Sequence, residues 1–252
     1  LHLSLRRQRQ MCIRDRNVVF LPFDLTVPFA RICARSGHMR LKRFDIADVY
    51  RENLLAGGQP RAVLAASYDI ISQEPDPSAE AEVLALMYEL LQMPGLAGEA
   101  WNVELSHESI LRVFLQRFPA QFHSALLEAL PQYLARGSDA RVRHLLGSAG
   151  MPVSLLDEVD AWNIYEDFDT AVHTLAELLT PEERTKLAEP LAHLVSVVRL
   201  AREFSVQSKI YLVPLFSHSH THYRNGTMMA VSKMSSGGKH RDCLLYTSPS
   251  PR

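Results

Sequence analysis

The residues best suited to chemistry are two arginines, Arg51 and Arg61, which flank a loop over residues 52–60. The loop contains a glycine pair and a proline, which exclude regular structure. A guanidinium group is planar and permanently charged, so it can hold two phosphate oxygens at once. Upstream, Asp24 and Thr26 add an acid and a hydroxyl. By themselves these residues favour a simpler interpretation, with two solvated hairpin charges and an aspartate that caps a turn.

The segments around this loop predict an antiparallel pair of strands. Residues 41–50 and 61–71 have strand-like composition and are separated by the loop that contains the glycine pair. Before them, a helix is predicted to open at Pro28 and to reach Arg35, because proline suits the first turn of a helix. Ser36 and Gly37 follow and are predicted to end that helix, because glycine is typical at a helix end.

The rest of the chain changes from a helical pattern to a strand pattern. Residues 76–205 are mostly helical, and residues 206–238 return to strands. Strands, a long helical stretch and strands again predict an α+β fold, with a sheet core interrupted by a largely helical insertion. Within the insertion, Thr180 and Pro181 followed by two acids predict a capped helix start. Pro190 predicts a break in that helix.

Composition and charge exclude several classes of function. The chain has 252 residues and a formal net charge of −1, and residues 17–238 carry 19 Lys and Arg against 26 Asp and Glu. This acidic balance argues against broad electrostatic capture of nucleic acid, so any such contact requires a local patch. There is no apolar run of about eighteen residues. The three cysteines show neither metal spacing nor a disulfide framework. We therefore expect a cytoplasmic protein that does not contact membranes.

Both ends of the chain differ in pattern from its middle. Residues 11–16 and 243–252 resemble translated sequencing-adapter sequence. We therefore expect adapter-derived, non-native arms and leave them out of the fold prediction. The predicted organisation is an arm over residues 1–16, a first core part over 17–75, the insertion over 76–205, a return to the core over 206–238 and a second arm over 239–252.

Three blocks in fixed order resemble one family, the histidyl-tRNA synthetases. Residues 21–31 read Leu-Pro-Phe-Asp-Leu-Thr-Val-Pro-Phe-Ala-Arg, residues 42–51 read Lys-Arg-Phe-Asp-Ile-Ala-Asp-Val-Tyr-Arg, and residues 67–71 read Ser-Tyr-Asp-Ile-Ile. The resemblance implies a class II aminoacyl-tRNA synthetase-like antiparallel sheet core. It also implies that the predicted strand pair is the motif-two hairpin of that fold, whose loop meets ATP and the acceptor end of tRNA.

The resemblance assigns roles to the four polar residues. Asp24 and Thr26 fall where the family grips histidine. Arg51 falls at the arginine that contacts the α-phosphate during adenylate formation, where a carboxylate attacks an anionic phosphorus. Arg61 falls at a basic position at the far end of the loop. These four residues are therefore the expected remnant of a nucleotide- and tRNA-binding site.

Three other positions depart from the pattern of active relatives. Those enzymes carry an acid or amide and a glutamine where this chain has Ala62 and Ala65, and a catalytic arginine where it has Ser219. Methyl groups cannot hydrogen-bond a substrate, and each lost polar contact costs about 1–3 kcal/mol. We therefore expect no catalytic residue here and no cofactor, with ATP as a ligand only if the nucleotide site is retained.

Within this family the chain is similar to the synthetase-like domain of the amino-acid-starvation kinases, which phosphorylate the alpha subunit of translation initiation factor two. The similarity rests on the short loop ending Gly58-Gln-Pro-Arg61 and on Tyr68-Asp-Ile70. It implies a catalytically degenerate domain that senses uncharged tRNA, controls a serine/threonine kinase domain of the same parent chain and forms a homodimer in the full-length protein. Two alternatives stay open: a divergent active histidyl-tRNA synthetase, and a synthetase-like regulatory subunit of ATP phosphoribosyltransferase.

Three alternating histidines, His218, His220 and His222, invite a metal-site interpretation. On a strand they would share one face at a spacing of about 6–7 Å, which is wide for three ligands from one segment. No acidic or cysteine partner stands close in sequence. We therefore expect a polar loop or strand edge here and no metal.

Overall fold

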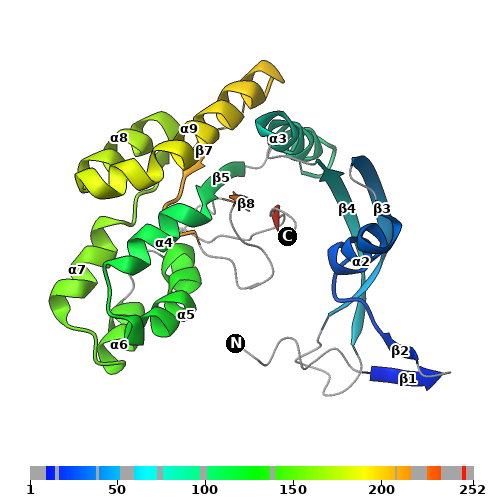
Figure 1. The fold of residues 1–252 in the computed structure, drawn as a ribbon, viewed down its shortest axis with the longest axis horizontal. Helices are drawn as coiled ribbons and strands as arrows, with labels where there is room; N and C mark the ends of the chain where they lie inside the picture. Colours follow the sequence, from blue (N-terminus) through cyan, green and yellow to red (C-terminus); the bar gives the residue numbers. More distant parts are fainter. Residues whose placement is uncertain are drawn as a thin grey trace. The chain divides into compact units, whose positions relative to one another are not determined.

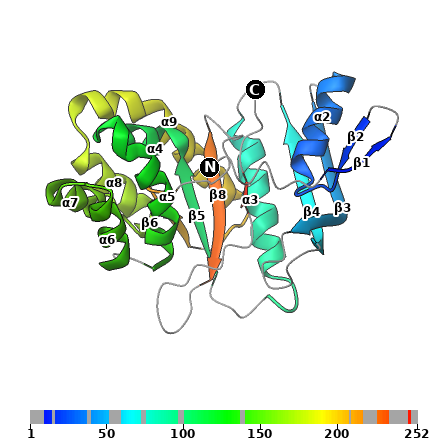
Figure 2. The same ribbon diagram turned by 90° about the horizontal axis from the view of Figure 1, so that it is seen from below.

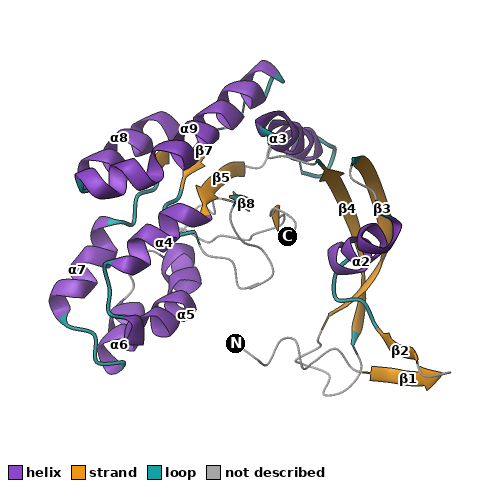
Figure 3. Cartoon of the chain, in the orientation of Figure 1, coloured by secondary structure: helices purple, strands orange, loops and turns teal. Residues whose placement is uncertain are grey.

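The chain forms two compact units, residues 1–76 and residues 77–252, and each is described by itself (Figure 1). The computed structural model describes residues 10–14, 17–37, 40–51, 60–72, 76–96, 101–136, 140–207, 209–216, 226–233 and 246–247. Helices and strands both occur, in the α+β mixture that the sequence predicts (Figure 3).

Over its described residues, the first unit contains two strand pairs and one helix. Its elements are β1 (Gln10–Arg14), β2 (Asn17–Phe20), α2 (Thr26–Ser36), β3 (Leu41–Arg51) and β4 (Arg61–Ile71). Both pairs, β1 with β2 and β3 with β4, are antiparallel. The predicted strand pair around the loop is thereby confirmed. Because β1 falls inside residues 1–16, its pairing leaves the adapter origin of that arm a prediction.

Helix α2 confirms the predicted helix and begins two residues before Pro28. The proline therefore sits in the first turn, where its missing N–H leaves no intrahelical bond unmade. At the other end Gly37 adopts a left-handed backbone with φ 68°, and its N–H donates to the carbonyl of Cys33 at 2.9 Å. This is the glycine-capped helix end that the sequence predicts.

The second unit combines a five-stranded sheet with a set of helices (Figure 2). Strand β5 is parallel to β7 and antiparallel to β8, and the strand order is β6-β7-β5-β8-β9. The elements are α3 (Pro77–Leu91), β5 (Trp101–His107), α4 (Glu108–Gln116), α5 (Ala120–Arg136), α6 (Ala140–Ser148), α7 (Val153–Ala161), β6 (Glu166–Asp167), α8 (Phe168–Leu178), α9 (Pro181–Glu203), β7 (Ile210–Leu212), β8 (Thr227–Lys233) and β9 (Tyr246–Thr247).

The core of this unit is built from the apolar faces of its helices and of β5 and β8. Trp162 and Phe114 are fully buried, with ring centroids 5.2 Å apart, and Phe118 lies 4.8 Å from Phe114. Tilted aromatic pairs at such distances add to the stabilisation from burial alone. These rings lie among α4, the segment that follows it, and the end of α7, so they hold these helices together.

The predicted break at Pro190 is wrong. Helix α9 runs without interruption from Pro181 to Glu203, with Pro190 inside it. An internal proline costs about 3 kcal/mol because it removes one backbone hydrogen bond and crowds the preceding turn. Leu187 and Leu194, on either side of the proline, are fully buried. The burial of these leucines outweighs the cost of the internal proline, so tertiary packing overrides the helix break that the sequence predicts.

The start of α9 confirms the predicted cap. The Thr180 hydroxyl accepts from the N–H of Glu183 at 3.3 Å, and the Glu183 carboxylate accepts from the N–H of Thr180 at 2.9 Å. Pro181 occupies the first helical position. Two backbone donors that the helix cannot satisfy are therefore satisfied reciprocally.

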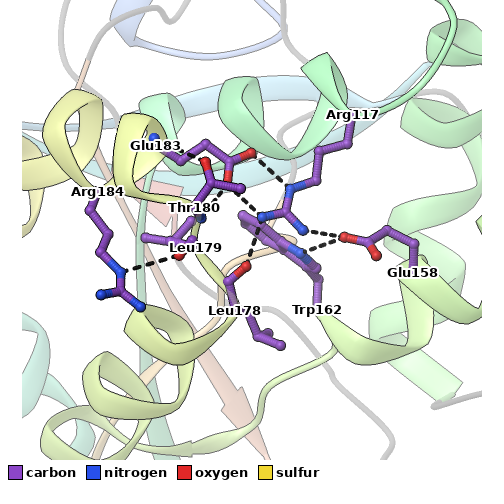
Figure 4. A network of polar contacts seen from close by, with 8 residues as sticks. All are labelled: Arg117, Glu158, Trp162, Leu178, Leu179, Thr180, Glu183 and Arg184. Atoms are coloured by element: carbon purple, nitrogen blue, oxygen red, sulfur yellow. Dashed lines mark hydrogen bonds and ion pairs between the residues drawn. The ribbon is translucent and has the colours of Figure 1, made fainter.

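Arg117 joins this cap to two other helices (Figure 4). Its guanidinium makes two hydrogen bonds to Glu183, at 2.6 and 2.9 Å, a third to Glu158 of α7, and a fourth to the carbonyl of Leu178 at 2.8 Å. It also lies 4.8 Å from the centre of the Trp162 ring. The residue after α4 thus clamps α7, the end of α8 and the start of α9.

His107 caps α4 in a way that requires a neutral imidazole. Its Nδ1 accepts from the N–H of Ser109 at 3.1 Å, which protonation would forbid. Burial is the largest of the effects that lower the pKa of His107 to about 4; the nearby His193 and Arg112 act in the same direction, and Glu108 opposes them. His193 itself is paired with Glu80 of α3 at 3.0 Å.

Lowering the pH from 7 to 4.5 is therefore expected to destabilise the second unit through His107. The unfolded histidine has its ordinary pKa of 6.5 and takes up a proton first. The contribution is complete above pH 6.5 and is lost as the pH falls towards 4. After allowance for the exposed part of the ring, we expect a loss of about 1–2 kcal/mol. Urea titrations followed by tryptophan fluorescence would measure it.

The matched control is His107→Asn, because asparagine also caps helices but does not titrate. Its free energy of unfolding should fall less than that of the wild type between the two pH values. An identical pH dependence in both proteins would show that the acid sensitivity comes from other groups.

Candidate functional site

The β3–β4 hairpin places Arg51 and Arg61 directly opposite each other. The two residues are a register pair at the end of the hairpin next to the loop, and the pairing continues without a bulge to Leu41 and Ile71. Side chains of directly opposed residues point to the same face of a strand pair. Two like charges at such positions repel each other, so the pair is destabilising by itself and favours an anion between them.

Alternation along the strands separates the two alanine positions. Ala65 is paired with Ala47 and belongs to the same set of alternate residues as Arg51 and Arg61. Ala62 is paired with Tyr50 and belongs to the other set. The arginine face therefore contains only one of the two positions at which active relatives carry polar groups.

Arg51 is held by the segment that precedes α2. Its guanidinium carbon lies 3.7 Å from the centre of the Phe23 ring, and its Nη1 donates to the backbone carbonyl of Phe23. Partial burial lowers the pKa of Arg51 from its ordinary value, while the charge of Asp24 acts in the opposite direction. The side chain remains a cation at every physiological pH.

Asp24 and Thr26 stand at the start of α2, and Asp24 directly follows Phe23, the residue that contacts Arg51. The Asp24 carboxylate accepts from the N–H of Val27 at 3.0 Å and so caps the first turn of the helix. Thr26 is the first residue of α2. Asp24 therefore caps a turn, as the sequence alone already suggests, and its charge also acts on Arg51.

Arg61 differs from Arg51 in its surroundings. It is exposed, and its side chain makes no hydrogen bond, ion pair or ring contact among the described residues. One of the two opposed arginines is thus already engaged with the protein, and the other faces solvent. The site offers an anion one accessible cation and one that is partly covered.

A third arginine on the same face was missed in the sequence. Arg43 donates to Asp69 at 3.0 Å and to the carbonyl of Leu25 at 3.2 Å, and its guanidinium lies 3.6 Å from the centre of the Phe29 ring. It also contacts Asp45 at 3.2 Å. Arg43 fastens α2 to the hairpin. In the observed register Arg43 lies opposite Asp69, so the two charges form a cross-strand pair.

A buried polar cluster in the second unit has its contacts satisfied. Glu104 of β5 is only 2% exposed, and its carboxylate accepts from the hydroxyls of Tyr165 at 3.1 Å and Ser232 at 2.7 Å. Asn102 donates to the Tyr165 oxygen at 3.2 Å, and the ring of Tyr165 is stacked on that of Tyr211 at 4.7 Å. This cluster joins β5, β7 and β8 to the segment before β6.

Other predicted residues lie outside the described part of the chain. These are Ser219 and the three histidines His218, His220 and His222. Within the described ranges, no group of three or more His, Cys, Asp or Glu side chains is placed to hold a metal ion. Among the helices in those ranges, none has the length and apolar character needed to cross a membrane.

Comparison with protein families gives one match over most of the chain. The family model described as histidyl-tRNA synthetase matches residues 11–239. Among curated proteins, the chain is 24% identical over 256 residues to the eIF-2-alpha kinase GCN2 of Schizosaccharomyces pombe, which covers 96% of this chain and 16% of that protein. It is 27% identical over 206 residues to the kinase of the same name from Mus musculus, a match that covers 77% of this chain and 12% of that protein.

Enzymes and solved structures of the same kind are also similar. Histidine–tRNA ligase 1 of Bacillus anthracis is 28% identical over 143 residues, which covers 55% of this chain and 32% of that protein. The crystal structure of a histidyl-tRNA synthetase from Nostoc sp. PCC 7120 matches 85% of this chain and 49% of its own, with a TM-score of 0.70 and 18% identity. The chain thus spans less than a fifth of the length of the two kinases and about half of the synthetase structure.

Proposed function

The chain belongs to the histidyl-tRNA synthetase family, and from this premise we propose that it is a regulatory domain that binds uncharged tRNA and does not charge it. Most of its length resembles the corresponding domain of the GCN2 kinases. The likeness to the Nostoc structure confirms the predicted class II synthetase fold. The fold alone does not distinguish an enzyme from a binding domain.

The observation that carries the proposal is the pair Arg51 and Arg61, opposed across the open end of the hairpin. Two cations at opposed positions repel each other and favour an anion between them. The described neighbour whose charge opposes that of Arg51 is Asp24. A phosphodiester group satisfies both guanidinium groups through charge-assisted hydrogen bonds. Because the rest of the body is acidic, this local patch suits the end of a strand better than a whole duplex.

The proposed loss of catalysis rests on what faces the arginines. Ala65 belongs to the arginine face of β4, and its methyl group can neither donate nor accept a hydrogen bond there. Adenylate formation requires groups that bind the transition state more tightly than the substrates. A tRNA sensor has no such requirement, so an alanine is tolerable for binding and unfavourable for catalysis.

The partner and location belong to the same proposal. The kinase relatives are far longer than this chain, so we propose that it controls a serine/threonine kinase domain of the same parent polypeptide, in the cytoplasm and as a homodimer. Binding of RNA at the hairpin would shift the balance between two states of that polypeptide only if the states differ in affinity for the RNA.

Uncharged tRNA is expected to bind at least about 10-fold more tightly than the same tRNA carrying an ester-linked amino acid, a difference of about 1.4 kcal/mol. The ester adds bulk at the terminal ribose, where the arginine pair is proposed to act. Equilibrium filter binding at one fixed salt concentration would measure both affinities.

A pyrophosphate-exchange assay with histidine and ATP is the companion measurement, and no exchange above background is expected. Equal binding of charged and uncharged tRNA would overturn the sensor proposal. Exchange at an enzymatic rate would favour the alternative of a divergent active synthetase.

A further inference from the structure

Phe23 covers Arg51 with both its side chain and its backbone. The guanidinium carbon lies 3.7 Å from the ring centre, and the same residue's carbonyl accepts a hydrogen bond from Nη1. Phe23 is 39% exposed, so part of the residue faces solvent. One face of the cation and one of its donors are therefore occupied by a partly exposed residue.

The backbone on both sides of Phe23 is fixed to β3. The carbonyl of Pro22 accepts from the N–H of Tyr50 at 2.8 Å, and the carbonyl of Leu25 accepts from Arg43 at 3.2 Å. These two bonds keep Phe23 beside Arg51 without involving Arg51 itself. The ring therefore lies beside Arg51 between two anchored carbonyls.

The groups that hold Arg51 are neutral. An aromatic face and a carbonyl satisfy a cation less well than phosphate oxygens, which form charge-assisted and often paired hydrogen bonds. The nearby carboxylate of Asp24 is bound to the N–H of Val27. A phosphate group that reaches the site can therefore compete successfully for the guanidinium, at the cost of the ring contact.

We propose that Phe23 gates Arg51, so that a bound phosphate must displace the phenyl ring before it contacts both arginines. This inference rests on the proposed function, because the phosphate is that of uncharged tRNA. Arg61, which is exposed, receives the anion first, and Arg51 completes the contact once the ring has left. Phe23 is then a residue that sets affinity without contributing a bond to the ligand.

The test is a double-mutant cycle on the binding of uncharged tRNA to the full 252-residue chain. Phe23→Leu removes the ring and keeps the backbone carbonyl, so we expect it to tighten binding about 3-fold, the equivalent of an exposed cation–π contact. In an Arg51→Met background the same change should have no effect, because there is no cation left to cover.

Phe44→Leu is the matched control, since Phe44 is 78% exposed and belongs to the opposite set of β3 residues. Its tRNA affinity should equal that of the wild type. Unchanged or weaker binding by Phe23→Leu overturns the gate. So does an equal effect of Phe23→Leu in both backgrounds, which would indicate a purely structural role.

A second measurement does not depend on tRNA. The NMR signal of the Arg51 Nε–H group should show a ring-current shift in the free protein, which disappears in Phe23→Leu and on addition of inorganic pyrophosphate. A shift that pyrophosphate leaves unchanged overturns the gate. If the shift behaves as expected but no variant binds tRNA, the gate stands and the proposed function fails. If the wild type binds tRNA and Phe23→Leu changes nothing, the proposed function stands and the gate fails.

Discussion

Replacing Arg51 and Arg61 together by methionine is expected to weaken the binding of uncharged tRNA about 100-fold. The two residues are opposed in register at the end of the hairpin. Each charge-assisted contact to phosphate contributes about 1.5 kcal/mol or more, so the loss of both amounts to roughly 3 kcal/mol. Methionine keeps an unbranched apolar stem and removes the guanidinium group with its charge and donors. Filter binding over a range of salt concentrations would measure the effect.

The salt dependence separates direct contact from general charge. Loss of two phosphate contacts should reduce the slope of log K against log salt by about 1.5. The control is Arg31→Met with Arg35→Met, two exposed arginines of α2 in the same unit, which changes the net charge equally. Equal weakening by both double variants would assign the effect to overall charge and contradict a site at the hairpin.

The hairpin is the part of the site that the sequence predicts best. Strand-forming composition on both sides of a glycine-containing loop fixes two antiparallel strands. Alternation then decides which residues of each strand share a face, and the observed register pairs Arg51 with Arg61 and Arg43 with Asp69. The same alternation puts Ala62 on the other face, which a comparison of aligned positions alone does not reveal.

The contact between Phe23 and Arg51 could not be predicted in the same way. It joins a non-helical segment to the end of β3, so no sequence period relates the two residues. It also depends on the rotamer of a long side chain, which neighbouring packing decides. Likewise, the continuity of α9 through Pro190 depends on burial of distant residues such as Leu194, which local propensity does not include.

Arg117→Met is expected to destabilise the second unit by about 2–4 kcal/mol, because breaking a fully buried ion pair costs about 3–5 kcal/mol and partial exposure reduces that figure. The guanidinium is only 20% exposed and bonds to Glu183 and Glu158, so its removal leaves two carboxylates in a partly buried position without their cation. Chemical unfolding followed by tryptophan fluorescence reports this unit alone, because Trp101 and Trp162 are the two tryptophans of the chain.

The pH dependence identifies the cause of this destabilisation. The hydrogen bond from Arg117 is the largest of the effects that lower the pKa of Glu183 below its ordinary value. A carboxyl group with a lowered folded pKa stabilises the protein above its unfolded pKa, and that contribution disappears as the pH falls through the folded pKa. The difference between wild type and Arg117→Met should therefore shrink in acid.

The control for Arg117 is Arg112→Met, which removes an exposed arginine paired with Glu108 one helical turn away. Such a pair contributes at most about 0.5 kcal/mol, so this variant should unfold almost as the wild type does. If Arg117→Met were equally mild, the clamp would contribute little, and burial of Trp162 and Phe114 would have to hold α4, α7 and α9 together. If its effect persisted unchanged in acid, lost packing of the arginine stem on Trp162 would explain it better than lost charge.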